Sequence, residues 1–124
     1  MASKAYSNQG KWSIRRVRST TGISGRPLTS ALWTPNSVAG QTEILWMYSQ
    51  SNQHEGWNVD ISYRFNILHL PDKNLIRLKV WAGSTLVLDS GNITDTSSDS
   101  LKGGRLGVFC YSQERVLWSN LNYK

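Results

Sequence analysis

The chain contains 124 residues, of which 39% are hydrophobic, 18% charged and 10% aromatic. A chain of this length and composition can bury a core, so we expect residues 1–124 to form a single globular domain rather than a disordered segment. The formal net charge of +6 favours acidic partners in general, without choosing among their classes. No apolar stretch approaches the length of a membrane span, so no membrane insertion is expected, and nucleic acid is not among the partners that we predict.

Short, strand-like periods of apolar residues run along the chain, without a long helical stripe. In chain order, strands are expected at 11–18 and 42–48. A third strand is expected at 59–70, where apolar and polar residues alternate. One face of this strand carries Val59, Ile61, Tyr63, Phe65 and Ile67.

A turn at Pro71-Asp72-Lys73-Asn74 connects the third strand to a fourth at 75–81. Proline presets φ in this turn, and Asp and Asn tolerate turn conformations. The two faces of the fourth strand differ in character, with Ile76, Leu78 and Val80 on one and Arg77, Lys79 and Trp81 on the other. The sequence therefore predicts a β-hairpin with one apolar face.

Further strands are expected at 86–89, 105–111 and 116–121, with a polar, Ser-rich loop at 94–100. Several short strands at close spacing, separated by glycine-containing turns, are typical of a sandwich or a barrel. The predicted fold class is therefore all-β.

Candidate catalytic and metal-binding groups are scattered along the chain. The single cysteine, Cys110, excludes an internal disulfide and lies in an apolar run, so we expect a buried thiol. His54 and His69 have no Cys or second His at zinc spacing. Nothing in the sequence brings Asp60 and Asp89 together as the paired acids of a glycosidase. We expect no catalytic residues and no metal site.

Short motifs follow one another in a specific order: Ser19-Thr20-Thr21-Gly22, Ala31-Leu32-Trp33, Gly40-Gln41, Leu45-Trp46, Gly56-Trp57, Tyr63-Arg64, Ile76-Arg77, Asp89-Ser90-Gly91, Gly103-Gly104-Arg105-Leu106-Gly107, Phe109, Ser112-Gln113-Glu114 and Ser119-Asn120-Leu121. This set resembles the C-terminal domain of thrombospondins over nearly the whole chain. The resemblance implies an antiparallel β-sandwich of the concanavalin-like (L-type lectin-like) jelly-roll type. It also implies an extracellular module that binds cell surfaces, glycosaminoglycans and calcium.

The chain departs from the pattern of that family in three ways. It resembles the second half of the domain, and the acidic segments that hold much of the family's calcium lie in the other half, so we expect no cofactor, with calcium as the alternative. The family's second Val-Val-Met adhesion peptide corresponds to Leu78-Lys79-Val80, with a lysine at its centre. The loops after Trp46 and Gly91 are longer. Because a half-length jelly roll exposes a sheet edge or an apolar face, we expect a homo-oligomer.

The lengthened loop after Trp46 is the first candidate binding site, and its side chains suit a neutral sugar. Amides, carboxylates and histidine can satisfy sugar hydroxyls, and an aromatic ring can stack on the apolar face of a sugar. The residues assigned to this site are Tyr48, Gln50, Asn52, Gln53, His54, Glu55 and Trp57. The alternative interpretation is a solvated polar loop with Trp57 in the core.

A second candidate site is a basic patch for sulfated glycosaminoglycans, made of Lys11, Arg16 and Arg18. A solvated strand face is the alternative interpretation. Trp81 shares a strand face with Arg77, and these two residues are expected to serve in stacking or in an interface. Asn92-Ile93-Thr94 is a glycosylation sequon, which can be occupied only in a protein that passes through the secretory route.

The predicted function is that of a small, multivalent lectin that is secreted and recognises glycans or glycoproteins of the cell surface or the extracellular space. The alternative is a non-catalytic adhesion module that binds protein receptors or heparin-like chains in the matrix. The first ten residues are polar and show no signal peptide.

Overall fold

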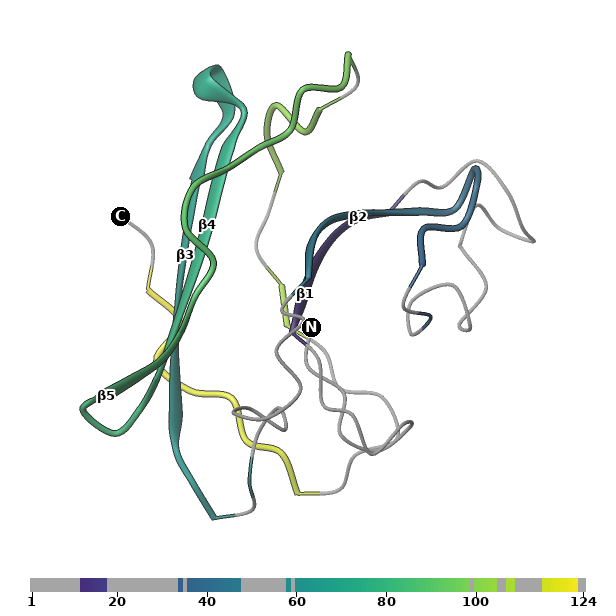
Figure 1. Ribbon diagram of the computed structural model, residues 1–124. Coiled ribbons are helices and arrows are strands. Elements are labelled where there is room, and N and C mark those ends of the chain that lie inside the picture. The colour runs from purple at the N-terminus through teal and green to yellow at the C-terminus, as the bar shows by residue number, and fades with distance from the viewer. Residues whose placement is uncertain are drawn as a thin grey trace.

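The computed structural model contains two antiparallel β-sheets (Figure 1). It describes residues 12–17, 34, 36–47, 58, 60–98, 100–104, 107–108 and 115–122. The smaller sheet pairs β1 (Ser13–Val17) with β2 (Thr42–Met47). The larger sheet contains β3 (Tyr63–Leu70), β4 (Leu75–Ala82), β5 (Thr85–Asp89) and β6 (Ile93–Thr94). In the described ranges, the helical content is one short 3-10 turn, η2 (Pro71–Lys73).

The smaller sheet confirms the strands predicted at 11–18 and 42–48. Its register runs antiparallel from Ser13 opposite Met47 to Val17 opposite Thr42, with one irregularity after Ile14. A tight turn leads into β2, in which the backbone N–H groups of Val38 and Thr42 each donate to the carbonyl of the other at 2.9 Å. Gly40 takes a positive φ of 71° within this turn, a conformation that glycine adopts without steric cost.

The hairpin of β3 and β4 also follows the prediction, with Leu70 opposite Leu75 and Tyr63 opposite Ala82. The turn between the strands is η2, followed by Asn74 in the left-handed conformation at φ 51°. The N–H of Asn74 donates to the carbonyl of Pro71 at 3.1 Å. This turn fixes the register, and the register places alternate residues of both strands on opposite faces of the sheet.

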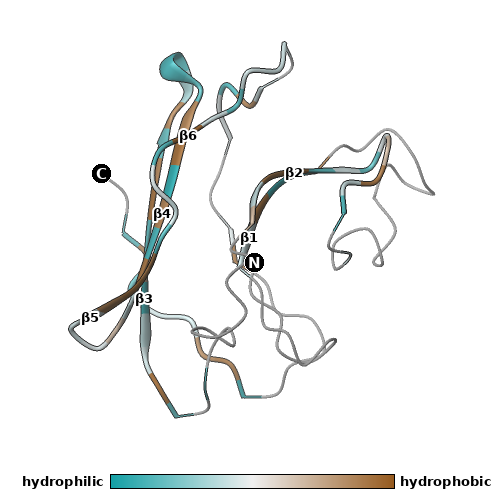
Figure 2. Cartoon of the chain, viewed as in Figure 1, coloured by the Kyte–Doolittle hydropathy of each residue, from teal (hydrophilic) through white to brown (hydrophobic). Residues whose placement is uncertain are grey.

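The remaining two strands both pair with β4 and lie along its other edge. β5 pairs with the C-terminal half of β4, with an irregularity between Val80 and Trp81, and β6 pairs with the first two residues of β4. Figure 2 shows that apolar residues run along β4 and β5, whereas the η2 turn at the end of the hairpin is hydrophilic. β4 is therefore the central strand of the larger sheet.

The core lies between the two sheets. Val80 is fully buried and Trp12, which directly precedes β1, is 2% exposed; Leu78 and Leu88 complete the buried cluster. The Trp12 ring packs at 5.7 Å from the Phe65 ring, and the Phe65 ring at 5.9 Å from that of Trp118. Because Trp12 leads into β1 and packs with residues of β3, β4 and β5, the core joins the two sheets, which is consistent with a β-sandwich. The predicted all-β, antiparallel fold class is confirmed.

A polar cluster provides a second connection between the sheets. Arg16 of β1 donates from Nη1 to both carboxylate oxygens of Asp95, at 3.0 and 3.2 Å, just beyond β6. Its other terminal nitrogen pairs with Glu43 of β2, and Ser97 also contacts the guanidinium. The Arg16 and Asp95 side chains are only 11% and 8% exposed, so this ion pair is largely removed from water.

The loop predicted at 94–100 buries two of its polar side chains instead of exposing them to solvent. Asp95 and Ser100 are buried, although both are polar. The Ser100 hydroxyl donates to Oδ1 of Asn74 at 2.9 Å, and the Asp95 N–H donates to the Asn74 carbonyl at 2.9 Å. Asn74 therefore shapes the hairpin turn and also holds the segment after β6.

Two of the strand predictions differ from the structure. Residues 116–121, predicted as a strand, are exposed and form no strand, and Leu117 is 93% exposed. Gly107 and Val108, the described part of the predicted strand 105–111, are likewise outside a strand. The apolar alternation is present in both segments, but a strand also requires a hydrogen-bonded partner. Ile61 precedes β3 and Ile67 is half exposed, so the buried face of β3 is shorter than predicted.

Candidate functional site

The solvent-facing side of the larger sheet, here called the outer face, carries several charged and aromatic side chains among the described residues. The register puts alternate residues of β3 and β4 on this side, opposite the buried Leu78 and Val80. Its cross-strand rows join β3 to β4 and β4 to β5: Arg64 with Trp81 and Leu86, Asn66 with Lys79 and Asp89, and Leu68 with Arg77.

Arg64 and Trp81 form the first row of the outer face. The guanidinium carbon of Arg64 lies 4.4 Å from the centre of the Trp81 ring, which is the geometry of a cation–π contact. The two residues stand directly opposite each other on β3 and β4, so the hairpin itself sets the contact. Arg64 remains exposed while it stacks on the Trp81 ring.

Arg77 and Asp89 form a two-pronged ion pair at the other end of the face. Nε and Nη2 of Arg77 donate to the two oxygens of Asp89 at 2.9 and 2.7 Å. The Arg77 hydrogen bond lowers the pKa of the Asp89 carboxyl to about 2, with further contributions from the Gly91 N–H and the Lys79 charge. The pair is therefore ionised at any physiological pH.

Lys79 lies between these two groups, opposite Asn66 on one side and Asp89 on the other. It makes no ion pair with any residue that the structure describes. Three cations and one carboxylate give the outer face a net charge of +2. Leu68 and Leu86 are exposed beside the charged groups, so the face is basic and partly apolar.

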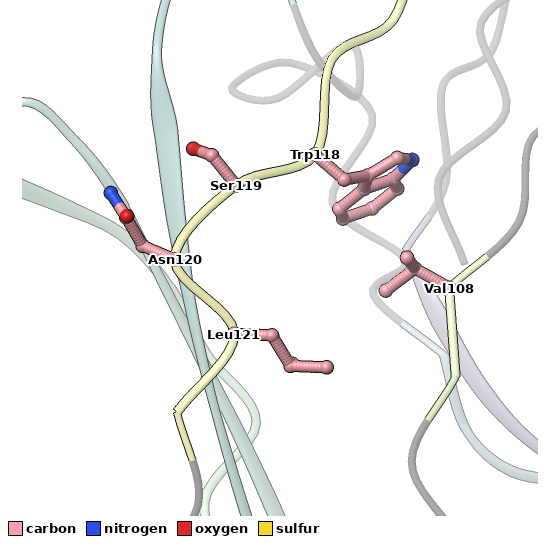
Figure 3. A pocket seen from close by; sticks show the side chains of 5 residues that line it. All are labelled: Val108, Trp118, Ser119, Asn120 and Leu121. Atoms are coloured by element: carbon pink, nitrogen blue, oxygen red, sulfur yellow. The ribbon is translucent and has the colours of Figure 1, made fainter.

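A shallow pocket of about 300 Å³ lies elsewhere, along the C-terminal segment. It is lined by Val108, Trp118, Ser119, Asn120 and Leu121. Figure 3 shows Trp118 and Leu121 pointing toward Val108, with Ser119 and Asn120 turned away from it. The inner wall is therefore apolar, and it offers few groups that could orient a polar ligand.

Comparison with known proteins places these observations in a family. The family model described as thrombospondin C-terminal region matches residues 2–124. The chain belongs to the thrombospondin C-terminal region family. It is similar to thrombospondin-3 of Mus musculus, with 43% identity over 111 residues that cover 88% of this chain and 11% of that protein. It is also similar to thrombospondin-3b of Danio rerio, at 41% identity over 90% of this chain and 11% of that protein.

A further relative is cartilage oligomeric matrix protein of Bos taurus, at 40% identity over 90% of this chain and 14% of that protein. The chain therefore spans between 11% and 14% of the length of these relatives. The resemblance inferred from the ordered motifs is confirmed by both comparisons.

The structure gives the thrombospondin-like motif Asp89-Ser90-Gly91 a physical role. Asp89 accepts the N–H of Gly91 at 2.9 Å in addition to the Arg77 guanidinium. The Ser90 hydroxyl accepts the N–H of Leu78 at 2.9 Å and donates to the Gly91 carbonyl. Gly91 has a positive φ of 67°. The motif thus ends β5, redirects the chain toward β6 and fixes one wall of the outer face.

One residue of Leu78-Lys79-Val80, the segment for which the sequence resemblance implies an adhesion peptide, lies on the same face. Leu78 and Val80 are buried, whereas the intervening Lys79 is on the outer face. A partner that approaches this segment in the folded chain therefore meets an ammonium group rather than the two apolar side chains.

The basic patch predicted from Lys11, Arg16 and Arg18 needs correction. Arg16 is largely buried and its guanidinium is held by Asp95 and Glu43, so it does not face solvent as a site for sulfate groups. The sequence could not reveal this, because Asp95 is 79 residues away along the chain. Lys11 and Arg18 lie outside the described residues.

The predicted sugar-binding loop also lies outside the described residues. None of its assigned members has a described position: Tyr48, Gln50, Asn52, Gln53, His54, Glu55 and Trp57. Trp81 and Arg77, predicted to serve in stacking or in an interface, do lie on one face, together with Arg64, which was not predicted. A signal for Arg64 was present, because the hairpin turn places it opposite Trp81.

No group of three or more His, Cys, Asp or Glu side chains that could hold a metal ion occurs in the described part of the chain. Nor is any helix there long and apolar enough to cross a membrane.

Proposed function

We propose that this chain is a non-catalytic, extracellular adhesion module that binds acidic chains, such as heparin-like glycosaminoglycans, on its outer face. The observation that supports this most strongly is the alignment of Arg64, Lys79 and Arg77 beside Trp81 on one exposed sheet surface. A rigid sheet holds these groups at fixed spacing, so little side-chain ordering is required when a ligand binds.

The chemistry of each group suits a sulfated chain. The guanidinium of Arg64 presents a planar set of donors that matches the oxygens of sulfate or carboxylate groups. Lys79 supplies an ammonium that makes no ion pair with the described residues of the chain. Trp81, partly exposed beside Arg64, offers the ring surface that Arg64 leaves uncovered for contact with the C–H groups of a sugar. Arg77 is already neutralised by Asp89, so binding is expected to centre on Arg64, Trp81 and Lys79.

Family membership supports the extracellular setting. The name of the bovine relative describes an oligomeric protein of cartilage matrix. We propose the same general setting for this chain, together with self-association through apolar side chains that are exposed outside the rows of the outer face, Leu117 and Leu121 among them. A monomer by light scattering at working concentration is the result that contradicts self-association.

The proposal is tested by retention on heparin. Arg64→Ala, Lys79→Ala and Trp81→Ala should each elute at lower salt than the parent chain. Lys73→Ala is a matched control, because Lys73 is an exposed cation of the same hairpin that lies in the η2 turn, beyond the face. If Lys73→Ala and Lys79→Ala lower the elution salt equally, heparin is held by general charge attraction. If all four variants elute at the same salt as the parent chain, the site is rejected.

A second proposal is that the chain recognises neutral glycans through the Tyr48–Trp57 loop. It is supported by the additional residues that the loop carries relative to the family pattern, and by their hydroxyl-binding chemistry. A double Asn52→Ala, His54→Ala variant should lose sugar binding and remain folded. Unchanged agglutination of cells by this variant refutes the proposal. Neutral-sugar binding should be nearly independent of salt, which separates it from binding on the outer face.

A further inference from the structure

The sequon Asn92-Ile93-Thr94 lies where the chain leaves β5 and enters β6 (Figure 2). Its middle residue is not proline, so the sequence satisfies the requirement for N-linked glycosylation. The proposed binding function does not use these residues. Their positions in the fold nevertheless decide whether a glycan can be carried there.

The three residues of the sequon alternate in exposure. Ile93 is 9% exposed and pairs with Ile76 on the core side of β4, whereas Asn92 and Thr94 are exposed. Extended backbone sends alternate side chains to opposite sides, so Asn92 and Thr94 both point away from the core. Within the described residues, neither side chain makes a hydrogen bond. A substituent on the Asn92 amide therefore displaces no hydrogen bond of the described residues.

The register also determines where such a glycan stands. Thr94 pairs with Leu75, which is on the same side of β4 as Arg77 and Lys79. Asn92 precedes Thr94 by one extended repeat and therefore lies nearer to the Arg77 row. Gly91, held by Asp89, fixes the approach of the chain to this point.

We propose that Asn92 is an N-glycosylation site whose glycan stands over the Arg77 end of the outer face. The glycan restricts access to the face from the Arg77 end, beside Lys79, and directs acidic ligands toward Arg64 and Trp81, at the other end of the sheet. This inference rests on the proposed function for passage through the secretory route and for the role of the face.

The modification is a group transfer to the Asn92 side chain. The donor is an oligosaccharide linked to a lipid pyrophosphate. A bond forms between the anomeric carbon of the sugar and Nδ2 of Asn92, and the bond from that carbon to the pyrophosphate oxygen breaks. Nδ2 loses one proton, and the lipid pyrophosphate leaves.

The experiment begins with the full chain secreted from animal cells behind a leader sequence. Intact mass is measured before and after treatment with a peptide N-glycosidase, which converts a glycosylated Asn92 to Asp. Thr94→Ser is the matched control that retains the sequon, and Thr94→Val and Asn92→Gln remove it through two different residues. The parent chain and Thr94→Ser should carry the glycan and the other two should not. Secreted parent chain with an unmodified Asn92 overturns the proposal.

The position of the glycan is tested separately on heparin. Asn92→Gln from the same cells should elute at higher salt than the glycosylated parent chain, because the ligand then reaches Lys79, in the row beside Arg77, without obstruction by the glycan. Identical elution salt overturns the placement of the glycan over the face. If neither form is retained on heparin, both the proposed heparin binding and the shielding of that face are rejected. The mass measurement then still decides whether Asn92 is glycosylated.

Discussion

Replacement of Asp95 tests how the two sheets are held together. Asp95→Ala removes the carboxylate that accepts two hydrogen bonds from Arg16, and it leaves a guanidinium that is only 11% exposed. Breaking a buried ion pair from one side costs about 3–5 kcal/mol, because the remaining charge stays out of water. We expect a loss of about 3 kcal/mol, near the lower limit, because the half-exposed Glu43 remains beside Arg16.

The matched control is Glu43→Ala, which removes the other carboxylate of the cluster. The Glu43 side chain is 47% exposed, so its pair with Arg16 is expected to contribute less than about 1 kcal/mol. A double variant, Arg16→Met with Asp95→Leu, removes both buried charges and should cost less than Asp95→Ala alone.

The assay is urea unfolding followed by tryptophan fluorescence, with the free energy of unfolding obtained by linear extrapolation. The slope of the transition should be the same in all variants. A cost for Asp95→Ala equal to that of Glu43→Ala would refute the reasoning, because it would mean that Asp95 is effectively solvated.

Three further results are expected. Asp89→Asn removes the one carboxylate of the outer face and raises the net charge of that face, so this variant should elute from heparin at higher salt; earlier elution counts against the site. Leu88→Ala should lower the free energy of unfolding by about 2–5 kcal/mol, because Leu88 is buried. Leu86 is on the same strand but half exposed, so Leu86→Ala should change this free energy by no more than about 0.5 kcal/mol. Similar losses of stability in the two variants would contradict the assignment of faces. Burial opposes ionisation of Asp95, but its hydrogen bonds with Ser97 and Arg16 outweigh that effect and hold its pKa below the ordinary value. The ionised Asp95 therefore stabilises the fold fully above about pH 4, and this contribution is lost as pH falls through the folded pKa. Identical acid unfolding curves for the parent chain and Asp95→Asn would contradict this expectation.

The hairpin and its two faces could be predicted from the sequence because their determinants are local. The turn at Pro71–Asn74 sets the register, and alternation then separates Leu78 and Val80 from Trp81. Arg64 could have been assigned to the same face by extending that register. The family could be inferred for a different reason. Each short motif alone is common, but the occurrence of many of them in one fixed order is specific to the family.

Arg16 is not available to the predicted basic patch, because a strand pattern shows which residues share a face, but not what covers them. Arg16 alternates as an exposed residue would, and its partner Asp95 is brought to it by the packing of two sheets. The strand predicted at residues 116–121 was wrong for a related reason. Their apolar residues suit a strand, but in the described structure this segment pairs with no strand, and propensity alone does not supply the hydrogen bonds.

The outer-face site is tested most directly by NMR titration of the folded chain with a short heparin oligosaccharide. The largest shift changes are expected for the backbone amides of Arg64, Asn66 and Lys79 and for the indole N–H of Trp81. They should decline as salt is raised, because exposed charges are screened. Shift changes confined to the Tyr48–Trp57 loop, with the Trp81 indole unmoved, would contradict binding on the outer face.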